Sequence, residues 1–145
     1  MLNSILVGLL LAMATIAAHA VGTAWWLVRL RRIAEAHEST EAISFVTQLR
    51  TLCTTAVVLL SLHILEVIMW GIAYLLLVSG RALNTIEEAI YFSTVTFASL
   101  GYGDVVIEGP WRLLSAIQAM TGLLAFGWSS ALLFAVVQRT WRTKN

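Results

Sequence analysis

Three long stretches without charged residues set the strongest limit on how this chain can fold. Residues 1–28 and 113–138 contain no Asp, Glu, Lys or Arg, and residues 51–80 contain only Glu66. About 20 apolar residues in a helix cross the hydrocarbon core of a bilayer, so each stretch is long enough to span it. Only 12% of the 145 residues are charged, against roughly a quarter in a typical soluble domain. The sequence therefore predicts an all-α membrane protein with three transmembrane helices.

A fourth uncharged run, residues 89–103, is too short to cross the membrane as a helix. The segment Asn84-Thr85-Ile86-Glu87-Glu88 before it is typical of a capped helix start, with two carboxylates in the first turn. Gly101 and Gly103 lie at its end, within the stretch SLGYGDV. Irregular backbone at membrane depth is tolerated only where protein buries it or where it lines a water-filled path. We therefore expect a short re-entrant helix followed by a loop that does not face lipid.

The basic residues predict the orientation of the chain. Seven of the nine lie on one side of the predicted membrane, which the positive-inside rule makes cytoplasmic: Arg29, Arg31, Arg32, Arg50, Arg139, Arg142 and Lys144. The N-terminus is then outside the cell membrane and the C-terminus is in the cytoplasm. The outer loops carry a net charge of −2 and the cytoplasmic parts +4, so the outer side attracts cations.

The residue types in SLGYGDV suit the binding of a dehydrated cation. Such an ion needs a cage of oxygens, which consecutive backbone carbonyls supply if they all point toward one axis. This geometry alternates the sign of φ, which glycine permits and other residues resist. Gly101 and Gly103 are two residues apart, as the alternation requires. One loop forms only one wall of a cage and the chain has no internal repeat, so four copies around an axis are expected.

The segment Thr94 to Val105, TVTFASLGYGDV, resembles the pore loop of the potassium channel superfamily, whose usual signature reads T-x-x-T-[TS]-[VIL]-G-Y-G-D. The resemblance extends through residues 50–140 and leaves residues 1–49 uncovered. It implies a homotetrameric channel that conducts K⁺ passively across the membrane. The partners it implies are K⁺, lipid and further copies of the chain. No cofactor is expected apart from the permeant K⁺.

The resemblance also divides the chain into parts. They are an extra N-terminal transmembrane helix (1–30), a partly amphipathic cytoplasmic linker (31–50), a pore domain (51–140) and a short tail (139–145). The pore domain contains an outer helix (51–79), a pore helix (85–98), a selectivity filter (99–104) and an inner helix (111–138). A signal peptide is the alternative for the first part, because Ala18-His19-Ala20 resembles a cleavage site. The absence of basic residues from Met1 to Ser4 favours a retained span.

Site residues follow from the resemblance by position. The carbonyls of Ser99, Leu100, Gly101 and Tyr102 are expected to coordinate K⁺, with Gly103 completing the filter and Asp104 at the outer mouth. Gly122 falls at the position of the family's inner-helix hinge. The inner helix is expected to line a cavity with Leu123, Phe126, Ser130, Phe134 and Gln138. Phe134 is the gate candidate because a ring of four phenylalanines could close by dewetting, and packing against a neighbouring subunit is the alternative.

The filter departs from the usual signature at several positions. Ser99 replaces threonine, Ala98 replaces the residue before it, and Leu100 takes the place of valine or isoleucine. Val95 stands where some members carry a glutamate that pairs with the filter aspartate. The outer support of the filter is therefore expected to be a hydrogen bond from Tyr91 to Asp104. These changes leave a weakly selective cation channel as an alternative to a potassium channel.

His63 and Glu66 lie one helical turn apart in the second span, with Trp70 on the same face. A carboxylate at that depth is costly and normally faces protein. Three interpretations remain open: a structural pair bonded to each other or to hydroxyls of the pore helix, a pH-responsive element, or a metal site. The metal site would need ligands from elsewhere, because one helix supplies only two. His19 in the first span is expected to be a packed polar residue.

Other classes of function have little support. The sequence has no nucleophile and base pair, nucleotide-binding loop or metal-ligand motif, so we do not expect an enzyme. Nothing indicates nucleic-acid binding. A non-conducting membrane scaffold with a channel fold is an alternative for which no feature of the sequence speaks. The sequence does not indicate which stimulus opens the pore.

Overall fold

A computed structural model describes residues 2–36, 45–78 and 83–141. It contains four α-helices: α1 (Leu2–Ala36), α2 (Phe45–Val78), α3 (Ile86–Phe97) and α4 (Arg112–Trp141). A 3₁₀ turn, η1 (Gly109–Trp111), leads directly into α4. Three of the helices are long and apolar enough to cross a membrane. The prediction of an all-α membrane protein with three spans and one short additional helix is confirmed.

The long helices extend beyond the predicted spans. α1 has 35 residues and continues to Ala36, and α2 has 34 residues and begins at Phe45. At 1.5 Å per residue each is about 50 Å long, which exceeds the hydrocarbon core of about 30 Å. The charged ends are predicted to lie outside the core, where a helix can continue among lipid headgroups and water. The charge pattern therefore predicts where the chain crosses the membrane and does not predict where the helix ends. Residues 37–44 of the predicted linker lie outside the described residues.

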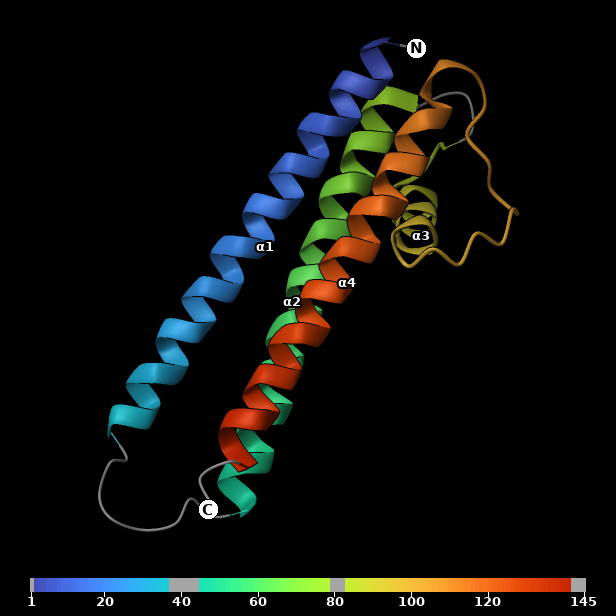
Figure 1. The fold of residues 1–145 in the computed structure, drawn as a ribbon. Helices are drawn as coiled ribbons and strands as arrows, with labels where there is room; N and C mark the ends of the chain where they lie inside the picture. The colour runs from blue at the N-terminus through green and yellow to red at the C-terminus, as the bar shows by residue number, and fades with distance from the viewer. Residues whose placement is uncertain (1, 37–44, 79–82, 142–145) are drawn as a thin grey trace.

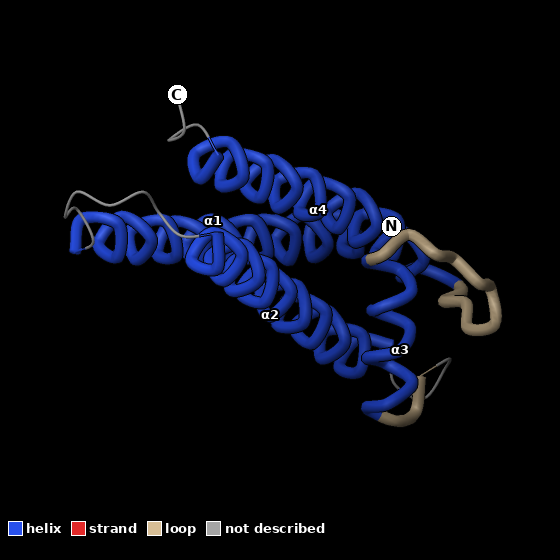
Figure 2. The backbone as a smooth tube through the Cα atoms, turned by 90° about the horizontal axis from the view of Figure 1, so that it is seen from below, coloured by secondary structure: helices blue, strands red, loops and turns tan. Residues whose placement is uncertain are grey.

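Figure 1 shows the arrangement of the helices. α2 and α4 run side by side in opposite directions, and α1 lies along both of them with its more extensive contact to α4. α3 lies beside the half of α2 and α4 that is near the N-terminus of the chain, and the loop after α3 returns to that same end before α4 begins. Seen from below, α3 and this loop lie to one side of the group formed by α1, α2 and α4 (Figure 2). The path from α3 through the loop is therefore re-entrant.

The N-terminus of α3 is capped by its own residues. The Glu88 backbone N–H donates to Thr85 Oγ1 at 3.2 Å, and the Glu88 carboxylate accepts from the backbone N–H groups of Asn84 (2.7 Å) and Thr85 (3.1 Å). This capping box satisfies donors that the first helical turn leaves free. The two backbone bonds hold the pKa of Glu88 below its usual value. The capped start expected from the sequence is present.

A buried polar network holds α3 between α2 and α4. The Tyr74 hydroxyl donates to Gln118 Oε1 at 2.8 Å, and Gln118 Nε2 donates to Ser93 Oγ at 2.8 Å. Ser93 Oγ in turn donates to the Val67 carbonyl at 2.7 Å. An apolar cluster that includes Trp70 surrounds this network near the filter end of the bundle. Because buried hydrogen bonds are costly to leave unmade, the network fixes the middle of α3 against α2 and α4.

Candidate functional site

The loop after α3 begins with a residue in an unusual conformation. The backbone N–H groups of Ala98, Ser99 and Leu100 still bond to carbonyls in the last turn of α3, at 2.9–3.0 Å. Ser99 then has a φ of 56°, in the left-handed region that usually belongs to glycine at the end of a helix. Ser99 is the only described non-glycine residue with a positive φ. The chain therefore turns sharply out of the helix at the first residue of the predicted filter.

The sign of φ alternates through the filter segment, which we define as residues 99–104. Ser99, Gly101 and Gly103 have φ of 56°, 58° and 78°, whereas φ is not positive at Leu100 or Tyr102. A Cβ added at Gly101 or Gly103 would meet no atom of the chain within 4 Å. Glycine is needed at these two positions for backbone conformation rather than for space. This is the alternation expected of a loop whose carbonyls point to one side.

The side chains of the filter segment are left uncovered by the chain itself. Leu100 is 53% exposed and Tyr102 is 66% exposed. The loop projects away from the three long helices in both views (Figures 1 and 2). Apolar and aromatic side chains exposed together on a loop are typical of a surface that contacts another molecule.

Tyr91 and Asp104 connect α3 to the end of the filter segment. The Tyr91 hydroxyl donates to Asp104 Oδ2 at 2.6 Å, the contact expected from the sequence. This bond holds the pKa of Asp104 below its usual value and raises the pKa of Tyr91. Asp104 is thus kept as a carboxylate at the end of the filter segment.

Gly122 lies where α4 packs closely against the end of α3. A Cβ at this position would lie 2.0 Å from the Phe97 carbonyl oxygen. Small residues at helix contacts permit this spacing in membranes. Gly122 is expected from the sequence to be a hinge, and the structure adds a packing requirement against Phe97, the last residue of α3.

The five residues expected to line a cavity share the exposed side of α4. None of them is buried in the single chain: Leu123, Phe126, Ser130, Phe134 and Gln138. Phe134 is 60% exposed. The Phe126 ring is more enclosed, because it packs against His63 and Phe97 with centroid distances of 4.6 Å and 5.6 Å. Phe126 therefore connects the end of α3 to the buried pair on α2, which the sequence did not indicate.

His63 and Glu66 are buried, and two further residues join them. His63 Nδ1 lies 3.2 Å from Glu66 Oε2, and His19 Nδ1 from α1 lies 2.8 Å from Glu66 Oε1. The Ser129 hydroxyl of α4 contacts Nε2 of both imidazoles, at 3.3 Å for His19 and 3.1 Å for His63. The hydroxyl partner is on α4 and not on the pore helix. His19 and Ser129 were not identified as partners from the sequence, although the mid-span position of His19 was a signal.

The chain matches a family of known proteins. A family model described as an ion channel matches residues 62–139, which is more than half of the chain. The matched range includes the second half of α2, all of α3, the filter segment and nearly all of α4, and it leaves out α1. No curated protein and no solved structure matches the chain.

Proposed function

The chain belongs to the ion channel family whose model matches residues 62–139, and we propose that four copies form a pore selective for potassium ions. The observation that carries this proposal is the alternating sign of φ from Ser99 to Gly103 at the end of a short re-entrant helix. A row of backbone carbonyls facing one axis replaces the hydration shell of K⁺. In this proposal Ser99, Leu100, Gly101 and Tyr102 supply the carbonyls.

The exposed surfaces of the single chain support assembly around the filter. Leu100 and Tyr102 need cover, and one loop encloses only one side of an ion. Four loops around a closed rotation axis would provide both the cage and the cover. The exposed face of α4, which includes Phe134, would then line the path below the filter or contact a neighbouring copy. Phe134 is the proposed gate of this path and Gly122 the proposed hinge.

The distribution of charge supports cation entry at the filter end. The first turn of α3 and the loop between α3 and α4, which lie at this end of the chain, carry four exposed carboxylates: Glu87, Glu88, Asp104 and Glu108. The arginines of the α1 C-terminus, Arg50 and Arg139 lie at the opposite end. By the positive-inside rule the filter end faces outward and the C-terminus is cytoplasmic. The C-terminal dipole of α3 adds negative potential on the inner side of the filter, which favours a cation there.

Potassium efflux from lipid vesicles tests this function. Vesicles loaded with K⁺ and containing the purified protein should release it, and native mass spectrometry of the same protein should show four chains. The Gly101→Ala variant should lose the flux, because an alanine is strained at a φ of 58°. Gly109→Ala is the matched control: its φ is 75°, a Cβ there also meets no atom within 4 Å, and it lies outside the filter. Equal loss of flux in both variants would contradict the proposed role of the filter segment.

A further inference from the structure

We propose that His19, His63 and Glu66 form a binding site for a divalent first-row transition metal ion, best suited to Zn²⁺, that ties α1 to the helices of the pore. The three side chains come from α1 and α2 and are 1%, 8% and 2% exposed. Their ligand atoms all lie within 4.8 Å of one another. Two imidazoles and one carboxylate are a ligand set that Zn²⁺ takes in proteins. α1 supplies the third ligand that two residues on a single helix lack.

The contacts of Ser129 limit which atoms of this cluster can carry protons. Each neutral imidazole has one N–H, and an ionised carboxylate only accepts. With Glu66 ionised, both Nδ1 atoms must donate to it, so both Nε2 atoms are acceptors. The hydroxyl of Ser129 has one proton for these two acceptors, at 3.3 Å and 3.1 Å. In this state one of the two contacts between Ser129 Oγ and an imidazole Nε2 has no proton between the two atoms, and both atoms are acceptors.

A metal ion on the Nδ1 side removes this mismatch. Both imidazoles then carry their proton on Nε2, and both can donate to Ser129 Oγ, which has two lone pairs. Histidines that bind metals usually donate their second N–H to a fixed acceptor, which sets the orientation of the ring. The two rings are already stacked, with centroids 5.3 Å apart and planes at 27°, so that both Nδ1 atoms face the same carboxylate. Ser129 fits the role of the shared acceptor.

Shifts of the side chains would bring the three ligand atoms to the distances of a tetrahedral site. Bonds of about 2.0–2.1 Å in tetrahedral geometry place neighbouring ligand atoms about 3.4 Å apart. The N to O distances of 2.8 Å and 3.2 Å would need to lengthen by about 0.6 Å at most, and the remaining separations, all within 4.8 Å, would need to shorten by about 1.4 Å at most. A second proton on one imidazole would also give each contact of Ser129 one donor and one acceptor. Such a proton, however, needs only one acceptor atom. Convergence of three ligand atoms from two helices favours the metal.

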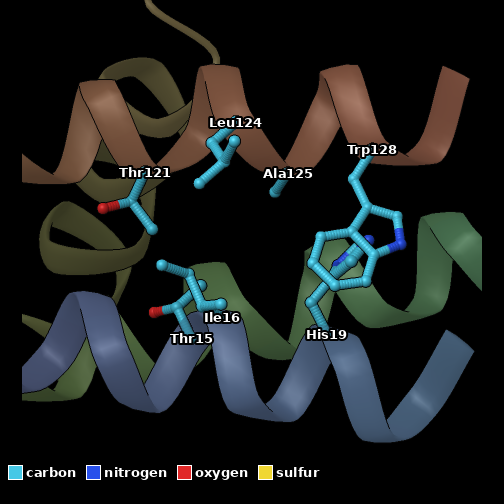
Figure 3. Close-up of a pocket in the computed structure, with 7 residues that line it drawn as sticks. All are labelled: Thr15, Ile16, His19, Thr121, Leu124, Ala125 and Trp128. Atoms are coloured by element: carbon cyan, nitrogen blue, oxygen red, sulfur yellow. The ribbon is translucent and has the colours of Figure 1, made fainter. Parts of the chain in front are cut away.

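A crevice between α1 and α4 borders the cluster on the side of His19. His19 forms part of its wall, with Trp128 beside it and Thr15 and Thr121 further along (Figure 3). Zn²⁺ held by three protein ligands keeps a fourth position for water or another small ligand. Because Zn²⁺ and one carboxylate leave a positive charge, hydroxide in that position would neutralise the site.

Titration with Co²⁺ tests the proposal directly. The full chain in lipid nanodiscs, stripped of metal, is titrated while the visible absorption of tetrahedral Co²⁺ is recorded. Exposed Cys53 and the third histidine, His37, are replaced beforehand by Cys53→Ser and His37→Gln, so that neither can bind the ion. We expect one Co²⁺ per chain, displaced by Zn²⁺. Absence of Co²⁺ uptake together with stability that depends on pH would show that the cluster holds a proton, and the proposal would be wrong.

Variants in the same background assign the ligands. His19→Gln and Glu66→Gln keep hydrogen-bonding capacity but remove good ligands, and each should weaken Co²⁺ binding by at least tenfold. Ser129→Ala should weaken it by about tenfold or more. Unchanged affinity in His19→Gln and Glu66→Gln would overturn the site.

X-ray absorption at the zinc edge is measured on the unsubstituted chain, so this test does not depend on whether a variant folds. Two imidazole nitrogens and a carboxylate oxygen at about 2.0–2.2 Å are expected, and a shell of sulfur or of oxygen alone would overturn the proposal. These measurements involve no ion flux, so their failure leaves the proposed channel function untouched.

Discussion

Substitution of Gly122 by alanine should disturb the filter more than it disturbs the helix that carries it. The new Cβ would lie 2.0 Å from the Phe97 carbonyl oxygen, and side-chain carbons essentially never approach other atoms closer than 3.0 Å. Either α4 or the end of α3 must therefore move by about 1 Å. Overpacking of this kind costs about 1–3 kcal/mol, whereas alanine in place of glycine within a helix stabilises by up to about 1 kcal/mol. The net expectation is destabilisation by about 1–2 kcal/mol.

Gly127→Ala is the matched control on the same helix. A Cβ at Gly127 meets no atom of the chain within 4 Å, so only the helix propensity changes and stability should rise by up to about 1 kcal/mol. The assays are thermal unfolding in detergent and the K⁺ to Na⁺ permeability ratio in bilayers. Since Phe97 comes two residues before Ser99, the ratio should fall in Gly122→Ala and stay unchanged in Gly127→Ala. A Gly122→Ala channel with normal stability and normal selectivity would refute the packing argument and favour a hinge alone.

Two further predictions concern the hydrogen bonds around α3. Tyr91→Phe removes the bond that lowers the pKa of Asp104, which therefore returns toward its ordinary value of 3.8. In the unsubstituted channel the bond stabilises the fold above pH 3.8 and is lost as pH falls through the lowered pKa of Asp104. Block of current by external acid should therefore begin at a higher pH in Tyr91→Phe than in the unsubstituted channel. Equal midpoint pH values for the block in the two channels would contradict this. Gln118→Leu leaves the buried Tyr74 hydroxyl without its acceptor and Ser93 without a donor, and should cost about 1–3 kcal/mol in thermal unfolding. An unchanged melting temperature would show that the network contributes nothing to stability.

Local features of the chain were predictable because they depend on neighbours in the sequence. The charge-free runs located the three spans, and the Thr85 to Glu88 spacing indicated the capped start of α3. The spacing of Gly101 and Gly103 indicated alternation of φ. Contacts between spans were not predictable in the same way, because they depend on the rotation and depth of each helix. The meeting of His19 with Glu66 is such a contact.

Two other features escaped prediction for related reasons. Helix ends lie where hydrogen bonding stops, and charged residues at the membrane surface do not stop it, so α1 and α2 run past the boundaries drawn from charge. A positive φ at Ser99 has no sequence signal, since serine rarely adopts it and the turn out of α3 imposes it.

The most direct test of the central claim is the reversal potential of the purified channel in a bilayer with K⁺ on one side and Na⁺ on the other. If four filter segments form a cage of carbonyls, current should reverse near the K⁺ equilibrium potential. Clear current that reverses near zero would contradict potassium selectivity. That result would show that Ser99 and Leu100 have relaxed the filter into one that passes both cations.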